Sequence, residues 1–238
     1  MNKTNGLTVF VHVPKTAGST VNDYLIRSKT PGERHVERWI DNPDAARSRI
    51  KGLDWVSGHV AFPAMRSRLA AATSRRLDFH TVIRDPLRQI MSHYNWLIEI
   101  YHRGPGFYED HPEHIKQISQ SIRAADNNDP AKVIEQIQLA PGLFLNQQIR
   151  TVHGQIPDDL SDATFRDILS VYRDLAWEDT LPRFVETISG LPYDAARREN
   201  TSPYHFDRAV FSSPVMQDFL QRHHAADMAL YRHVTAQA

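Results

Sequence analysis

The chain has 238 residues, of which 41% are hydrophobic and 24% are charged, a composition typical of a globular protein that can bury a substantial core. It contains no cysteine, which excludes disulfide scaffolds, thiolate zinc sites, iron–sulfur clusters and cysteine nucleophiles. Its 28 basic and 28 acidic side chains give a formal net charge of zero, which argues against a protein that coats nucleic acid through bulk charge. No segment reaches the roughly 18 apolar residues of a membrane span, and the first apolar run is too short for a signal peptide, so we expect a soluble, cytoplasmic protein.

Three apolar segments in the first third of the chain predict buried strands. Residues 7–13 (LTVFVHV) are β-branched and almost continuously apolar, as expected for a strand buried on both faces of a parallel sheet. A tight loop follows, and then Val21, Tyr24 and Leu25 fall at helical spacing. Residues 54–59 and 77–83 predict the second and third strands.

A long helix is predicted directly after the third strand. Asp85 is a good N-cap and Pro86 a good first helical residue. The apolar stripe of this helix comprises Leu87, Ile90, Met91, Tyr94, Leu97, Ile98 and Tyr101. Further helices are predicted around residues 115–122, 130–137, 161–170 and 180–189, the last ended by Gly190, and at 213–234.

Early alternation of strands and helices, followed by helices, predicts an α/β fold with a central parallel sheet flanked by helices. No linker divides the chain, so we predict a single domain over residues 1–238 with a helical insertion at about 103–142. That polar insertion is open to two interpretations, a lid over the substrate or a helical region with no ligand role.

The loop after the first strand (residues 14–20, PKTAGST) predicts an anion site. Its small residues let a ligand approach the backbone, and the helix that follows presents free N–H groups and a positive dipole end. Lys15 adds a mobile charge, while Ser19 and Thr20 add hydroxyl donors. The loop matches neither the Walker A pattern nor G-x-G-x-x-G, and an ordinary β–α turn with a surface lysine is the alternative.

A second anion site is predicted where the third strand meets the long helix. Arg84 ends the strand, where ligands bind in open α/β sheets, and Arg88 and Ser92 lie one and two turns into the helix. An arginine with a hydroxyl can clamp a phosphate. The alternative is that Arg84 pairs with a carboxylate and Ser92 is solvated.

These two segments together resemble the sulfotransferase superfamily, and more closely its carbohydrate-type branch, which contains the heparan sulfate 2-O-sulfotransferases and related bacterial enzymes. Residues 14–20 are similar to the Pro-Lys-Thr loop of that family, and residues 84–94 (RDPLRQIMSHY) to its Arg-Asp-Pro-x-x-Arg-x-x-Ser-x-Tyr segment. Residues 57–62 (SGHVAF) resemble its His-Gly-His-Val-x-Phe segment, with Ser57 in place of the first histidine. Residues 146–150 (NQQIR) resemble an Asn-x-Gln-Thr-Arg segment, and residues 200–202 lie where relatives carry a cofactor-contacting loop.

The resemblance implies a P-loop-like sulfotransferase fold and the cofactor 3′-phosphoadenosine 5′-phosphosulfate (PAPS), whose product is 3′,5′-adenosine bisphosphate (PAP). By the same resemblance, the first loop binds the 5′-phosphosulfate and the second motif binds the 3′-phosphate. The residues to which these binding roles transfer are Lys15, Thr16, Ala17, Gly18, Ser19 and Thr20 for the first group, and Arg84 and Ser92 for the second.

Sulfuryl transfer to a hydroxyl needs a base for the acceptor proton and a cation at the leaving oxygen. His59 is the predicted base and Lys15 the predicted cation, and no metal is expected. The alternative for His59 is a packed structural histidine. Among the other histidines, His12 and His80 are predicted to be structural, His93 could reach substrate, and His111 and His114 lack a third metal ligand. His223 and His224 are predicted to lie on a helix surface.

Asn146, Gln147 and Arg150 could bind the acceptor, or could form a helix face that packs on the sheet. We expect the acceptor to be a hydroxyl-bearing saccharide or a small molecule that contains a sugar, with no nucleic acid partner and the oligomeric state open. The arginines at 66, 68, 75 and 76 are close in sequence and are more typical of a solvated surface. Two other functions stay open: a nucleotide-dependent phosphotransferase with an atypical loop, and a nucleotide-binding module without catalysis.

Overall fold

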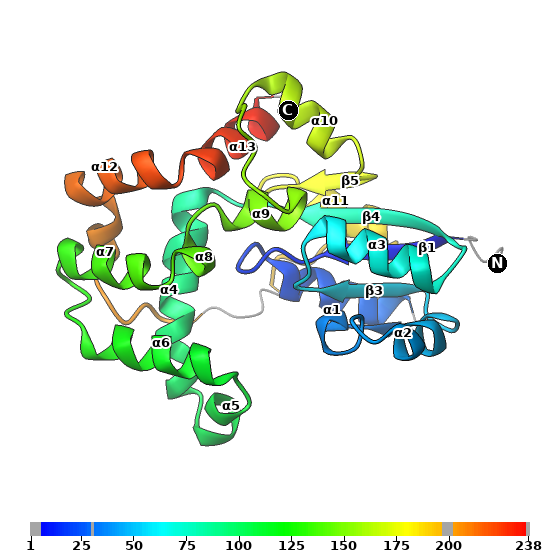
Figure 1. Ribbon diagram of the computed structural model, residues 1–238, viewed down its shortest axis with the longest axis horizontal. Coiled ribbons are helices and arrows are strands. Elements are labelled where there is room, and N and C mark those ends of the chain that lie inside the picture. The colour runs from blue at the N-terminus through cyan, green and yellow to red at the C-terminus, as the bar shows by residue number, and fades with distance from the viewer. Residues whose placement is uncertain (1–5, 30, 197–201, 237–238) are drawn as a thin grey trace. The chain divides into compact units, whose positions relative to one another are not determined.

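The computed structural model describes residues 6–29, 31–196 and 202–236. The chain is an α/β protein with a five-stranded, all-parallel central sheet flanked by helices (Figure 1). It forms two compact units, which are described separately. Of the described residues, those within 1–84, 148–200 and 229–238 form the first unit, and those within 85–147 and 201–228 form the second. No helix among the described residues is long and apolar enough to cross a membrane.

The sheet of the first unit has the strand order β2-β3-β1-β4-β5. Its strands are β1 (Gly6–Val11), β2 (Gly32–Glu33), β3 (Trp55–Gly58), β4 (Arg76–Val82) and β5 (Asp174–Ala176). The central strand β1 pairs with β3 on one side and β4 on the other, and Val9 lies beside Val56 and Phe79. Leu7, Val9 and Phe10 are fully buried, as the unbroken apolar run predicts.

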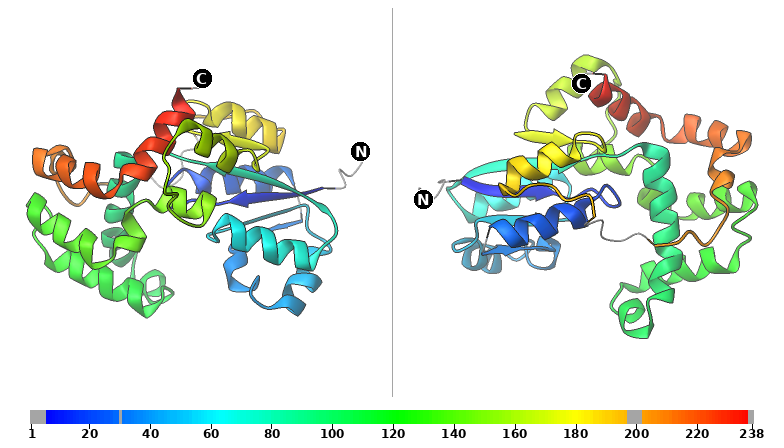
Figure 2. Two further views of the ribbon diagram at one scale, coloured as in Figure 1. Left: turned by 45° about the horizontal axis from the view of Figure 1, so that its top comes forward. Right: turned by 180° about the vertical axis from the view of Figure 1, so that it is seen from behind.

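Helices cover both faces of this sheet (Figures 1 and 2). On one face, α1 (Gly18–Ser28) and α11 (Leu181–Ser189) bury Val21 and Phe184 in a cluster with Phe10 of β1. On the other face, α3 (Phe62–Ala72) places the ring of Phe62 4.9 Å from that of Phe79. The remaining helices of this unit are η1 (Val36–Arg38), α2 (Pro43–Ile50) and α10 (Asp162–Leu169); α9 (Gln147–His153) and α13 (Ala225–Thr235) begin in the second unit and end in the first.

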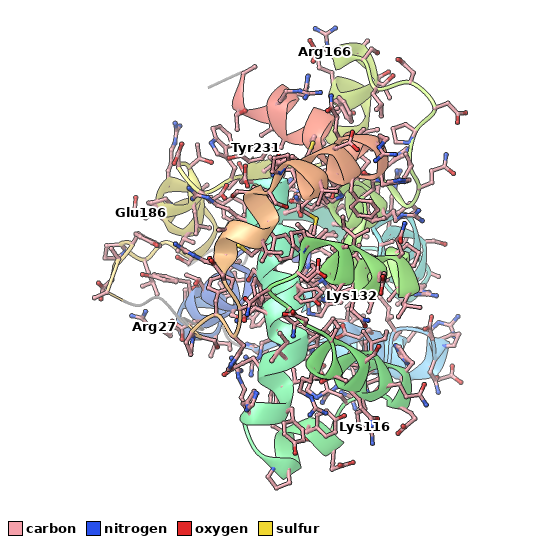
Figure 3. The ribbon with its side chains drawn as sticks, turned by 90° about the vertical axis from the view of Figure 1, so that its left-hand side faces the viewer. Arg27, Lys116, Lys132, Arg166, Glu186 and Tyr231 are labelled. Carbon is pink, nitrogen blue, oxygen red and sulfur yellow. The ribbon has the colours of Figure 1, made fainter. Side chains whose placement is uncertain are left out.

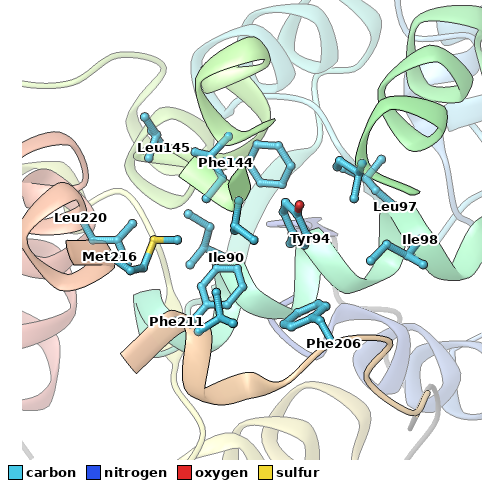
Figure 4. Packing of buried hydrophobic residues seen from close by; sticks show 14 of the residues in the cluster. Ile90, Tyr94, Leu97, Ile98, Phe144, Leu145, Phe206, Phe211, Met216 and Leu220 are labelled. Carbon is cyan, nitrogen blue, oxygen red and sulfur yellow. The ribbon is translucent and has the colours of Figure 1, made fainter. Parts of the chain in front are cut away.

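The second unit is helical, and its core forms along the predicted stripe of α4 (Pro86–His102). Figure 4 shows Ile90, Tyr94 and Leu97 of this helix packed among aromatic side chains, and the Tyr94 ring lies 5.6 Å from that of Phe206. Tyr101, the last residue of the stripe, is instead about half exposed, and the Arg123 guanidinium lies 3.7 Å from its ring centre. The other helices are α5 (Pro105–Glu109), α6 (Glu113–Ala124), α7 (Pro130–Leu139), α8 (Pro141–Phe144), η2 (Arg208–Ser212) and α12 (Pro214–His223).

The predicted insertion at 103–142 lies within the second unit and contains α5, α6 and α7. Its polar character comes in part from ion pairs between neighbouring residues on exposed helix faces. Lys116 contacts Glu109 and Glu113, and Lys132 contacts Glu135 (both lysines are labelled in Figure 3). These charges form a solvated surface around the apolar core.

The predicted helix starts are confirmed by their hydrogen bonds. The Asp85 carboxylate accepts from the backbone N–H of Arg88, and the Asp129 carboxylate accepts from that of Ala131. Gly190 ends α11 with φ 74°. The three predicted strands begin and end within one or two residues of the predicted positions, and the sequence pattern did not predict β2 or β5, which have only two and three residues.

The single helix predicted at 213–234 is wrong, because α12 and α13 are separated at His224. The placement of His224 on a helix surface is also wrong, since this side chain is fully buried and its Nδ1 accepts a hydrogen bond from the Asn146 backbone N–H at 2.8 Å. The Asn146 carboxamide oxygen accepts from the N–H groups of Ala226 and Asp227. A side chain distant in sequence therefore caps α13, and no local pattern reveals it.

Candidate functional site

Polar residues of the first unit gather where the parallel strands end. His12 follows β1, His59 follows β3, Arg84 lies two residues after β4, and Glu178 lies two residues after β5. The His12 and His59 ring centroids are 4.1 Å apart, and Nε of Arg84 is 3.7 Å from Oε1 of Glu178. In an open α/β sheet this carboxyl edge is where ligands bind. The structure therefore brings three predicted segments, the loop at 14–20, the segment at 57–62 and Arg84, to one edge of the sheet.

The loop between β1 and α1 has an unusual backbone. Lys15 and Ala17 have φ values of 65° and 72°, a region that side-chain-bearing residues rarely adopt and that costs about 1–2 kcal/mol per residue. The buried Thr16 hydroxyl fastens the loop by donating to the Val13 carbonyl at 2.9 Å. Backbone strain of this kind collects at ligand sites, because surrounding contacts hold the loop in a conformation that suits the ligand.

The start of α1 has no side-chain cap. Ala17 occupies the N-cap position and has no side chain that could accept from the first helical N–H groups. Gly18 follows, and a Cβ at this position would lie 1.9 Å from Nε2 of His12. Glycine is therefore required for the His12 ring to pack against the helix start. Ser19 is half-buried and Thr20 buried in the same first turn.

The ring of His59 is held in one tautomer. Its Nδ1 lies 2.9 Å from the His12 carbonyl oxygen, and a carbonyl can only accept, so Nδ1 carries the proton. The neutral ring then has its lone pair on Nε2, the form that a general base needs. The His59 backbone N–H donates to Oε2 of Glu37 at 3.0 Å.

The electrostatic surroundings lower the pKa of His59. Desolvation by the protein atoms near the ring is the largest cause, although His59 is exposed at the surface, and the nearby positive charges of His35 and Lys15 act in the same direction. The Glu37 carboxylate and the hydrogen bond to the His12 carbonyl oppose these effects. The result favours a neutral imidazole near neutral pH.

Glu37 joins two histidines. Its Oε1 lies 2.9 Å from Nδ1 of His35, and the His35 and His59 ring centroids are 6.1 Å apart. Burial disfavours the charge of Glu37, but hydrogen bonds from its own backbone and from His35 prevail and lower its pKa. Gly58 leaves room for this carboxylate, because a Cβ there would be 2.5 Å from Oε2.

Arg84 is anchored through its backbone by a buried side chain, Gln148. The Gln148 carboxamide accepts from the Arg84 N–H at 2.8 Å and donates to the Arg84 carbonyl at 2.9 Å. The Arg84 guanidinium donates to the Lys15 carbonyl at 3.2 Å. Arg84 thus links the strand end to the loop, and its contact with Glu178 matches the carboxylate pairing left open by the sequence.

The other predicted binding residues are Ser92, Asn146, Gln147 and Arg150, and they lie on α4, on α9 and just before α9. Ser92 is half-buried on α4 in the second unit. The Asn146 side chain donates to the His223 carbonyl and accepts from the Ala226 N–H, so that it bridges α12 and α13. Gln147 is buried, and its Oε1 accepts a hydrogen bond from Gln89 at 2.7 Å. Arg150 is exposed on α9 in the first unit. The contacts of Asn146 and Gln147 are those of structural residues.

Three further histidines, His12, His80 and His93, are described by their burial and their neighbours. Burial lowers the pKa of His80 to about 4, with the Asp174 carboxylate opposing it. His93 is buried and its Nδ1 is 3.1 Å from Oε1 of Gln147. His12 has its pKa lowered well below the usual value, mainly by burial and then by His59. Among the described residues, no group of three or more His, Cys, Asp or Glu side chains is arranged to hold a metal ion.

Comparison with known proteins adds no assignment, because no protein-family model and no curated protein matches this chain. The sequence alone missed Glu37, His35 and Glu178. The first two lie in an irregular segment without periodicity, and Glu178 follows a strand too short to recognise. Of the predicted loop at residues 200–202, Asn200 and Thr201 lie outside the described residues, while Ser202 accepts from Arg103 at 3.2 Å.

Proposed function

We propose that this protein is a sulfotransferase that moves a sulfuryl group from PAPS to an acceptor hydroxyl. One observation carries the proposal: the Lys15 loop, an imidazole held in the base-competent tautomer, and Arg84 all lie at the carboxyl edge of one sheet. The acceptor that we propose is a saccharide or a small molecule that contains a sugar.

The loop residues suit the phosphosulfate end of the donor. PAPS supplies the activated sulfuryl group when it is bound. Lys15 offers a positive charge, α1 offers the N–H groups of its first turn, and Ser19 and Thr20 offer hydroxyls. The lack of a capping side chain at Ala17 supports this assignment, because an oxyanion would satisfy N–H groups that otherwise need water.

His59 acts as the base in this proposal. Its Nε2 accepts the proton of the acceptor hydroxyl, while the His12 carbonyl holds the proton on Nδ1 and orients the ring. A pKa below the usual histidine value keeps Nε2 unprotonated at neutral pH. Glu37 holds the His59 backbone, and so acts as a positioning residue.

Lys15 and Arg84 supply the positive charge of the site. We assign Lys15 to the oxygen that leaves with the phosphate, where negative charge grows during transfer. Arg84 is assigned to the 3′-phosphate, and the same role stays a prediction for Ser92, which belongs to the second unit. Gln148 fixes the Arg84 backbone, so that this guanidinium needs little ordering when it meets an anion.

The test is a transfer assay with ³⁵S-labelled PAPS and a panel of oligosaccharides and alkyl glycosides. Wild-type protein should label at least one acceptor. His59→Ala should still bind PAP but should lose about 10²–10⁴-fold in transfer rate, the usual contribution of a general base. Lys15→Ala should lose both binding and transfer.

Matched controls separate site effects from general damage. Lys51→Ala and His114→Ala each remove the same type of side chain at exposed positions to which the proposal gives no role, and they should leave transfer unchanged. PAP binding without transfer by the wild-type protein would favour a binding module. Normal transfer by His59→Ala would require a different base.

A further inference from the structure

The first unit contains a pocket of about 720 Å³ that is lined by α3, by the end of α9 and by α10 with the residues just after it (these helices are labelled in Figure 1). This volume is within the range of small-molecule sites. None of the residues assigned to PAPS, to the base or to the acceptor lines the pocket. It is therefore a separate site, and its ligand has to be inferred from its own lining.

The floor of this pocket is apolar and held in place. Phe62, Val152 and Ile168 line it, and each is at most 8% exposed. The Phe62 ring lies 5.2 Å from that of Tyr172, whose hydroxyl donates to the Val152 carbonyl at 2.9 Å. These contacts join the three walls of the pocket, so that an apolar group finds a preformed surface and little has to reorganise when it binds.

The rim of the pocket adds exposed apolar surface. Pro63 and Ala70 on α3 are exposed, and so is Val171, two residues after α10 ends. Gly154 has φ 95°, and a Cβ there would lie 2.8 Å from Cγ of Pro63, so glycine is required where the chain leaves α9 beside this rim. A ligand with apolar side chains would remove this surface from water.

Two opposite charges line the pocket from different helices. Arg66 comes from α3 and Asp167 from α10, and both are exposed. Within the described residues neither forms an ion pair at 4.0 Å or less, with the other or with any third group. Arg68 on the same helix as Arg66 is, by contrast, paired with Asp41 at 2.6 Å. A separated cation and anion at one apolar pocket complement a ligand that has a carboxylate and an ammonium group apart from each other.

We propose that this pocket binds a short apolar peptide with free termini, about the size of a dipeptide. Its carboxylate binds Arg66, its ammonium group binds Asp167, and its side chains cover the apolar floor. An extended dipeptide spans up to about 7 Å, whereas a single amino acid carries both charges on one carbon and spans about half of that. This inference goes beyond the proposed sulfotransferase function and does not rest on it.

The test is calorimetric titration of the full chain at pH 7, without nucleotide, with L-leucyl-L-phenylalanine and four related probes. The N-acetyl form lacks the ammonium charge, the C-terminal amide lacks the carboxylate, the doubly blocked form lacks both, and glycylglycine lacks the apolar side chains. Wild-type protein should bind the free dipeptide with a Kd below about 1 mM. Each single block should weaken binding about tenfold, and glycylglycine should bind at least about 100-fold more weakly.

Charge variants assign each terminus. Arg66→Gln should bind the free dipeptide and its C-terminal amide equally, and Asp167→Asn should bind the free dipeptide and its N-acetyl form equally. Arg166→Gln (Arg166 is labelled in Figure 3) and Asp158→Asn are the matched controls, because both positions are exposed and lie outside the pocket lining. Both controls should keep both preferences.

A blocking variant tests the location independently of charge. Ala70→Trp places a large ring at the rim of the pocket and should abolish binding of every probe. Ala71→Trp makes the same change at the next position of α3, which is exposed but does not line the pocket, and it should bind the dipeptide as the wild type does. Circular dichroism of both variants verifies that the fold is kept.

Three outcomes overturn the inference: no saturable binding of the free dipeptide below about 1 mM by wild-type protein, equal binding of the free and doubly blocked dipeptides, or a charge preference that survives in the corresponding variant. Equal binding of the doubly blocked form would instead favour an internal segment of a partner protein. Failure of the proposed sulfotransferase function is distinguishable, because PAP would then fail to bind while the dipeptide titration stays unchanged.

Discussion

Replacing Gln148 by methionine tests how the protein holds Arg84. Methionine has nearly the same length and volume, so that the change removes hydrogen bonds with little loss of packing. Gln148 is 1% exposed, and its carboxamide forms hydrogen bonds of 2.8 and 2.9 Å with the Arg84 N–H and carbonyl groups. The methionine thioether offers no donor to the carbonyl and only a weak acceptor to the N–H group.

The magnitude follows from these two bonds. Each backbone group left without a partner in a buried site costs about 1–3 kcal/mol. Arg84 is only partly buried, so that water can replace part of the loss, and the lower end applies to each. We therefore expect Gln148→Met to lower the free energy of unfolding by about 2–3 kcal/mol. PAP affinity should fall about tenfold, because the Arg84 guanidinium is no longer anchored.

The assay is urea denaturation followed by circular dichroism, with calorimetric titration of PAP in parallel. Gln155→Met is the matched control, because it makes the same change at an exposed glutamine two residues after α9 ends at His153. The expected change in unfolding free energy for this control is below about 0.5 kcal/mol. A Gln148→Met protein as stable as the wild type would refute the reasoning, since the two hydrogen bonds would then contribute nothing.

Three further predictions concern the loop, the buried corner and the base. Ala17→Gly should raise the free energy of unfolding by about 0.5–1 kcal/mol in urea denaturation, because glycine adopts φ 72° without the penalty that alanine has there. A lower free energy of unfolding would contradict the claim that the loop backbone is strained at Ala17. Burial lowers the pKa of His224 to about 4, so that in mildly acidic solution the folded state binds fewer protons than the unfolded state. The free energy of unfolding should therefore be highest above about pH 6.5 and should fall by up to about 3 kcal/mol between pH 6.5 and pH 4. A His224→Gln variant should show a shallower fall in urea denaturation over the same pH range. The lowered pKa of His59 predicts that the acidic limb of the rate–pH profile lies below about pH 6.5. In the neutral ring, ¹⁵N NMR should show the proton on Nδ1, and a proton on Nε2 would contradict the role assigned to His59.

The sequence was informative where local chemistry determines structure. The apolar run of β1, the Asp85 cap and the stripe of α4 each follow from neighbouring residues, and the structure contains all three elements. Parallel strands end at one edge of a sheet, and so the residues after β1, β3 and β4 could be expected to meet there.

Other features depend on contacts between distant residues. The Gln148 bonds to Arg84 span 64 positions, and the Asn146 cap of α13 spans 80. Glu37 meets His59 from an irregular segment 22 residues earlier. No periodicity or local motif encodes such pairs, since they form only after the sheet and helices have packed.

Calorimetric titration with two nucleotides tests the central claim most directly. We predict that PAP binds the wild-type protein without added metal, binds at least about tenfold more weakly to Lys15→Ala, and competes with PAPS in the transfer assay. ATP with Mg²⁺ should bind more weakly than PAP. Tight binding of ATP–Mg²⁺ with no detectable binding of PAP would contradict the account and would favour a phosphotransferase.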